Sequence, residues 1–155
     1  MTWGEVQVIS LQKMFLDDEQ EIKIEDLPDL REDADIGVYL RRMPGAMNEA
    51  MQRIKTYVQN TWEYDEEEKK DVVVSIQKID KDTEDTAEIE MPESACVLLP
   101  LYIASQLYKE DDVGLATQYR NEFEVGLADL VTEIPTQREI VDTDRVEGWF
   151  EGWWY

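Results

Sequence analysis

Apolar residues recur at helical spacing near the start of the chain. Val8, Leu11 and Phe15 fall on one face, which predicts a helix that begins after Thr2. Thr2 is suited to cap this helix, and Glu5 stands three residues later, as in a capping box. The acidic run DDEQE ends the helical pattern.

The pattern is irregular in the next segment. Ile22 and Ile24 alternate with charged residues like a very short strand, and Pro28 disfavours a helix just before it. A short helix is predicted over residues 35–42, and the sequence MPG at 43–45 is predicted to end it. Pro44 is suited to the first turn of a second helix, which runs to about residue 60. The buried stripe of this second helix is predicted to consist of Ala46, Ala50, Ile54, Tyr57 and Val58, with Met47 and Met51 beside it.

A period of two replaces helical spacing between residues 72 and 91. Apolar residues occupy every second position in parts of DVVVSIQKI and again in TAEIEM, and the polar sequence DKDTED lies between the two runs. Such alternation is typical of strands with one buried face. The sequence therefore predicts a β-hairpin at about 72–91, inserted in an otherwise helical chain.

A helix pair with a short acidic turn between its helices is predicted over LPLYIASQLYKEDDVGLATQYRNEFE, residues 99–124. Apolar residues cover most of the circumference of its first helix, which predicts burial on several sides. Pro100 either lies near the start of this helix or kinks it. Val97, Leu101, Ala104 and Tyr108 are predicted to form one buried stripe of this first helix. The predicted core positions of the pair are Leu101, Tyr108, Leu115, Tyr119, Phe123 and Leu127.

The end of the chain differs from the rest. Residues 135–155 show little periodicity and are predicted to form an extended arm after a helical domain at 1–134. The arm ends in the aromatic residues Trp149, Phe150, Trp153, Trp154 and Tyr155. Exposed large aromatics favour docking, either on the core of the same molecule or on a neighbour, and the use of aromatic anchors at interfaces favours the neighbour. The predicted fold class is mainly α: a small helical bundle with an inserted hairpin and an extended C-terminal arm.

The charge of the chain limits its partners. The formal net charge is −22, with 37 acidic against 15 basic residues, while 43% hydrophobic residues suffice for a core. Such a field repels phosphate backbones and anionic membrane surfaces. The apolar run at 95–104 is too short to span a bilayer. MTWGEVQVIS lacks the regions of a signal peptide, so we expect a soluble protein made in a reducing cytoplasm.

Few residues suit catalysis or metal binding. The chain has no histidine, and its single cysteine, Cys96, lies in an apolar helix and is predicted to be a buried small hydrophobe. DKDTEDTAEIEM resembles the start of a calcium loop, but Asp85 and Met91 stand where that loop needs glycine and glutamate, so a turn explains the segment better. A magnesium-dependent helical hydrolase built on the clustered carboxylates is the least favoured hypothesis. We expect no enzyme, no cofactor and no metal.

Arg41 and Arg42 form the densest positive charge of the chain. One interpretation is favourable charge at the C-terminus of the helix predicted over 35–42. The other is contact with an acidic partner.

Residues 98–130, LLPLYIASQLYKEDDVGLATQYRNEFEVGLADL, resemble the C-terminal helix pair of the head–tail connector adaptor proteins of tailed phages. The shared pattern is a PLYxASxLY helix, an acidic turn, and then LAxxYRNEFE. DADIGVYLRRMPGAMNEAMQRI, residues 33–54, is similar to the front of the same proteins. The hairpin and the aromatic arm have no clear counterpart in the pattern.

This resemblance implies a structural protein of the virion neck. Adaptor subunits form a ring of about twelve copies beneath the portal protein and extend the channel through which DNA passes. A stopper or tail protein is implied below the ring, and the carboxylates are expected to let DNA slide without binding it. The rival hypothesis is an acidic interaction module, such as a DNA mimic that occupies the basic site of another protein.

Overall fold

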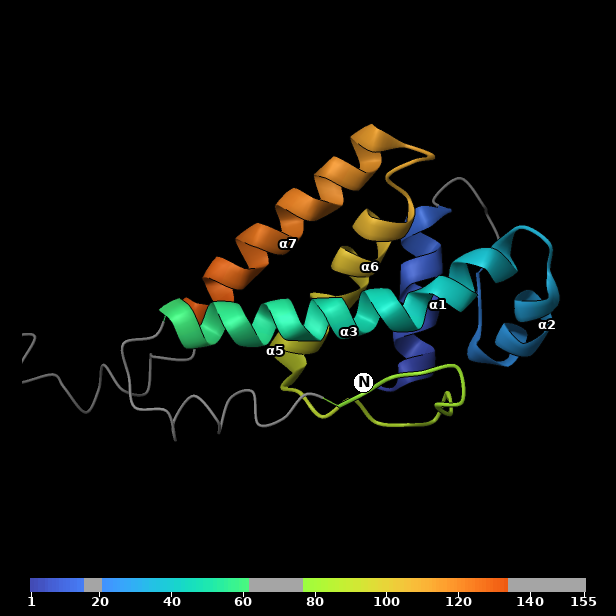
Figure 1. Ribbon diagram of the computed structural model, residues 1–155, viewed down its shortest axis with the longest axis horizontal. Coiled ribbons are helices and arrows are strands. Elements are labelled where there is room, and N and C mark those ends of the chain that lie inside the picture. Colours follow the sequence, from blue (N-terminus) through green and yellow to red (C-terminus); the bar gives the residue numbers. More distant parts are fainter. Residues whose placement is uncertain (16–20, 62–76, 134–155) are drawn as a thin grey trace, which may run out of the picture.

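The computed structural model describes residues 1–15, 21–61 and 77–133, and its described part is mainly helical (Figure 1). The predicted aromatic arm and the first strand of the predicted hairpin lie outside the described residues. The elements are α1 (Trp3–Met14), the 3-10 helix η1 (Ile24–Asp26), α2 (Leu27–Glu32), α3 (Ile36–Thr61), α5 (Glu93–Cys96), α6 (Leu99–Leu107) and α7 (Val113–Glu133).

The short helix α6 lies at the centre of the fold. It packs against α1, α3 and α7, and Figure 1 shows α3 crossing α1 and α6 while α7 returns from the end of α6. Burial of α6 on several sides is therefore confirmed: its buried residues are Leu99, Pro100, Tyr102, Ile103, Ala104, Ser105 and Leu107. The core continues into the other helices through residues such as Leu11, Met47 and Phe123, all fully buried.

Local signals set the starts of two helices, of which the start of α1 agrees with the prediction and the start of α6 settles the two alternatives for Pro100. The Thr2 hydroxyl accepts a hydrogen bond from the Glu5 amide (3.2 Å), and the Glu5 carboxylate accepts one from the Thr2 amide (2.8 Å), which completes the capping box. Pro100 lies in the first turn of α6, where its missing N–H costs nothing. Because α6 begins at Leu99, Val97 lies in the preceding turn and is 52% exposed, so its assignment to the buried stripe is wrong.

The predicted break at MPG is wrong. Residues 36–61 form the single helix α3, with Pro44 inside it. The proline removes one backbone hydrogen bond, but Leu40, Met43 and Met47 are buried on both sides of it, and this burial offsets the loss. The axis of α3 changes direction in its first part, as expected near an internal proline (Figure 1).

Residues 22–32 also differ from the prediction. The alternation of Ile22 and Ile24 does not form a strand; Ile24 opens η1, which leads directly into α2. Pro28 lies in the first turn of α2 and is compatible with it. Leu27 is buried completely and attaches this short unit to the core.

The predicted hairpin is not formed by the described residues. Residues 77–92, called here the 77–92 segment, contain no strand beyond one isolated antiparallel bridge between Thr2 and Glu88. The Gln77 side chain donates to the Glu88 carbonyl (3.1 Å) and accepts from the Glu90 amide (3.1 Å). The Gln77 side chain and the backbone of the first residues therefore make the hydrogen bonds that the predicted partner strand would have made. Ile89 is still buried in the core.

Candidate interaction surfaces

The first candidate surface is a hollow with an excess of positive charge, called here the basic hollow. It encloses about 430 Å³ and is lined by Arg41, Arg42, Gly45, Ala46, Glu49, Gln106, Leu107 and Lys109. Arg41, Arg42 and Lys109 are exposed, and in the described part of the chain none of them forms an ion pair. Three cations face one carboxylate there, in a chain whose net charge is −22.

Helical spacing on α3 explains how the basic hollow forms. Arg41, Arg42, Gly45 and Glu49 lie on neighbouring turns, and Gly45 leaves open space above the backbone. Because α3 continues to Thr61, the two arginines do not lie at a helix C-terminus, and that interpretation of their charge is wrong.

An aromatic cluster supports the helices beside the basic hollow. The rings of Phe15 and Tyr39 meet edge to face at 5.5 Å, and Tyr108 lies 6.0 Å from Phe15. The Tyr39 hydroxyl donates to Asp111, and this hydrogen bond raises the pKa of Tyr39 to about 12, although nearby Arg42 opposes the shift. The cluster therefore joins the end of α1 to α3 and to the turn after α6.

The second candidate surface is an apolar depression along α7, called here the α7 groove. It encloses about 700 Å³, and its lining residues are Leu98, Leu101, Gly114, Thr117, Gln118, Asn121, Glu122, Val125, Gly126 and Asp129. Val125 is 62% exposed, because it lies two residues from the buried Phe123 and Leu127 and therefore on the opposite side of the helix. The lining residues of α7 recur at helical spacing, so they form one stripe of its surface.

Small side chains on α7 create this depression. A Cβ atom at Gly126 would lie 2.2 Å from the Cδ2 atom of Leu98, so only glycine lets Leu98 approach the helix as it does. At Gly114 a Cβ atom would meet only Asp112, at 3.5 Å, so that end of the α7 groove is open. Neither glycine was recognised from the sequence, although two glycines within one long helix are a usable signal.

The predicted helix-pair residues divide into two groups. Tyr119, Phe123 and Leu127 are buried, whereas Leu101, Tyr108 and Leu115 are partly buried at the edges of the core. Tyr102 was not among the predicted core positions, yet it is fully buried, with its ring 5.1 Å from that of Phe123. The only signal for its burial was the apolar character of most of the circumference of this helix, which names no single residue.

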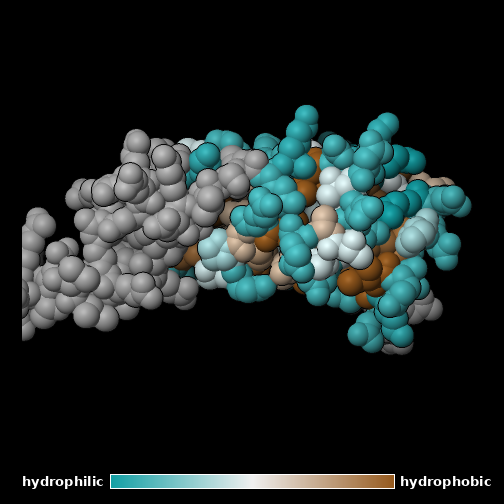
Figure 2. Space-filling model, turned by 90° about the horizontal axis from the view of Figure 1, so that it is seen from below, coloured by the Kyte–Doolittle hydropathy of each residue, from teal (hydrophilic) through white to brown (hydrophobic). Residues whose placement is uncertain are grey.

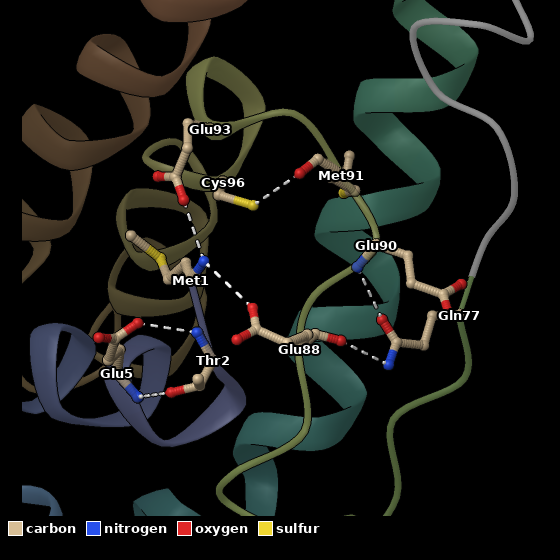
Figure 3. A network of polar contacts seen from close by, with 9 residues as sticks. All are labelled: Met1, Thr2, Glu5, Gln77, Glu88, Glu90, Met91, Glu93 and Cys96. Atoms are coloured by element: carbon tan, nitrogen blue, oxygen red, sulfur yellow. Dashed lines mark hydrogen bonds and ion pairs between the residues drawn. The ribbon is translucent and has the colours of Figure 1, made fainter.

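Polar contacts hold the 77–92 segment to the N-terminus (Figure 3). The Met1 amino group lies 3.0 Å from Glu93 and 3.6 Å from Glu88, and the hydrogen bond to Glu93 raises the pKa of that amine. The Cys96 thiol donates to the Met91 carbonyl (3.4 Å), and burial raises the pKa of this thiol. Cys96 is fully buried, as predicted, and is not positioned as a reactive group.

The described part of the face seen from below is mostly hydrophilic, with apolar residues in separate small areas (Figure 2). A depression beside the start of α1 is lined by Glu5, Glu21, Glu25, Glu88 and Glu93 among others. Glu5, Glu88 and Glu93 already bond to the backbone or to the Met1 amine, so they serve the fold.

The acidic turn at DKDTED has a structural use as well. The Asp80 carboxylate accepts from the Asp82 amide (2.8 Å) and from the Thr83 hydroxyl (3.3 Å), and the Thr83 amide donates to the Asp80 carbonyl (3.2 Å). Within residues 1–15, 21–61 and 77–133, no three acidic or cysteine side chains are placed to hold a metal ion.

Two further findings concern the whole described chain. None of its described helices is both long and apolar enough to cross a membrane. Comparison with known proteins gives no matching family model, no matching curated protein and no matching solved structure. The aromatic residues predicted for an interface, Trp149, Phe150, Trp153, Trp154 and Tyr155, lie outside the described residues.

Proposed function

We propose that this protein is a structural adaptor subunit of a tailed-phage neck, which forms a ring beneath the portal and joins head to tail. Residues 98–130 resemble the adaptor helix pair, which is the first support for this function. These residues form α6 and α7, and the rest of the core is assembled around α6. A rigid helix pair at the centre suits a subunit whose role is to provide a wall and interfaces.

The observation that best supports the proposal is the presence of two unlike surfaces on one subunit. The basic hollow is charged and the α7 groove is largely apolar, and they share no lining residue. In a ring each subunit offers one surface and receives a different one, so unlike contact surfaces are what such an assembly requires.

The net charge suits the same function. At −22, subunits repel one another at low salt and need specific contacts to assemble. In the proposed ring, carboxylates that face the channel repel the phosphates of the passing DNA, and the basic hollow receives an acidic surface of a neighbour or of the portal.

The copy number in DNA-filled virus particles tests the function directly. Quantitative mass spectrometry against the major capsid protein is expected to find about a dozen copies per particle, the number of a single ring. Absence from particles, together with abundance in infected cells, would overturn the proposal and favour an acidic module that binds a basic protein site.

Charge reversal in the basic hollow tests its part in assembly. The double variant Arg41→Glu, Arg42→Glu is expected to lower incorporation into particles about tenfold, because the attraction of the two arginines to the acidic surface of the proposed partner is replaced by repulsion. The matched control is Lys78→Glu, Lys81→Glu, which makes the same charge change at two exposed lysines outside the hollow. Equal incorporation of both double variants would show that the basic hollow has no role in assembly.

A further inference from the structure

The α7 groove is open to a partner along several turns of helix. From Gly114 to Asp129 its lining extends over roughly 22 Å of α7, at about 1.5 Å per residue. The partly exposed Leu101 and the largely exposed Val125 contribute apolar surface to it. Within the described residues, Val125 stays 62% exposed. The volume of the α7 groove, about 700 Å³, is in the range of binding pockets.

The same chain contains an aromatic segment suited to such a groove. The seven residues 149–155, WFEGWWY, hold five aromatic residues and a single charged side chain, that of Glu151. In a chain with a net charge of −22, this segment is least opposed by electrostatic repulsion when two copies approach.

We propose that the α7 groove binds the aromatic end, residues 149–155, of a neighbouring copy of this chain. Each large aromatic side chain buries about 150–250 Å² on docking, which makes tryptophans effective anchors. Gln118, Asn121 and Glu122 line the groove with side-chain oxygens that can accept the indole N–H hydrogen bonds. The choice of a neighbour over the same molecule rests on the proposed ring, in which every subunit both donates and receives.

The length of chain between α7 and the aromatic end permits this contact. Residues 134–148 number fifteen and span up to roughly 50 Å when extended. A domain of this size has a radius of gyration of about 15 Å, so an arm of this length reaches an adjacent subunit.

Two full-length variants separate donor from acceptor. Val125→Glu introduces a charge into the α7 groove and keeps the aromatic end, and the fold tolerates it because Val125 is 62% exposed. The double variant Trp153→Ser, Trp154→Ser keeps the groove and loses two anchors. Val38→Glu, at an exposed valine of α3, is the matched control for the groove variant.

Sedimentation velocity at about 0.15 M salt, where the Debye length is about 8 Å, measures association of these proteins alone and in equal mixture. We expect the unmodified chain and Val38→Glu to associate alike, and each of the two test variants alone to associate at least about tenfold more weakly. The mixture of the two test variants is expected to form a dimer, because one supplies the aromatic end and the other the groove.

Two outcomes would overturn the proposal. In the first, the mixture associates no more strongly than its components. In the second, the unmodified chain is monomeric and Val125→Glu moves tryptophan emission to longer wavelength, which places the aromatic end in the groove of its own molecule. The particle copy number does not depend on either result, so failure of the docking site and failure of the adaptor function are distinguishable.

Discussion

The helical core and the 77–92 segment are stabilised in different ways. Around α6 the contacts are apolar, and residues from four helices are buried completely. The 77–92 segment buries Ile79 and Ile89 but is otherwise attached by single polar groups, such as the Trp3 amide that donates to the Ala87 carbonyl (2.8 Å). The core is therefore stabilised by the close packing of many apolar side chains. The 77–92 segment is held mainly by a few hydrogen bonds, each with a specific partner.

Asn48 shows how specific those partners are. Its side-chain amide donates to the Ile79 carbonyl (2.8 Å) and accepts from the Ile79 amide (2.9 Å). The asparagine thus makes both hydrogen bonds that a neighbouring strand would make. Asp85 has a similar role, because it accepts from Gln7 (2.8 Å) and pairs with Arg31, which connects α1, α2 and the 77–92 segment.

The largest effect is expected in the core. Phe123→Ala removes a fully buried ring at the contact between α6 and α7 and is expected to lower the free energy of unfolding by about 3–5 kcal/mol. Denaturant unfolding followed by circular dichroism measures it, with Val125→Ala as the control on the exposed side of the same helix. Similar values for the two variants would contradict the buried position of Phe123.

An intermediate effect is expected where the 77–92 segment meets α3. Asn48→Ala leaves both Ile79 backbone groups without their partner and is expected to cost about 1–3 kcal/mol. Hydrogen exchange is the sharper measurement, because amides of residues 77–92 should exchange faster while those of α6 keep their protection. Gln52→Ala, at an exposed position one turn further along α3, is the control. Uniform loss of protection would show that the segment and the core unfold together.

The smallest effect is expected at the hydrogen bond between the Tyr39 hydroxyl of α3 and Asp111 in the turn after α6. The folded state raises the pKa of Tyr39 from 10.0 to about 12, so this contribution to stability is complete below pH 10 and is lost as the pH rises toward 12. Asp111→Asn is expected to move this pKa toward 10. Absorbance at high pH, compared with that of Tyr39→Phe, measures the change, and an unchanged titration would contradict the hydrogen bond.

The candidate surfaces could be predicted only in part. Arg41 and Arg42 are conspicuous in an acidic sequence, so a basic patch around them was open to prediction from composition. Glu49 lies near them because α3 continues past Pro44, and Lys109 joins them only because the end of α6 packs beside α3, which no local pattern reports. The α7 groove was missed because it is defined by the missing side chains of Gly114 and Gly126 and by Leu98 from another element.

By itself the sequence determined the mainly helical fold, the capping box of α1 and the burial of Cys96. These features depend on periodicity and on interactions within one or two turns, which neighbouring residues specify. Tertiary structure decided that α3 continues through Pro44 and that the alternating residues 86–91 form no strand. In both cases distant groups supply free energy that outweighs the local preference. For Pro44 these groups are the apolar residues of the core, and for the 77–92 segment they are the amides of Gln77 and of the first residues of the chain.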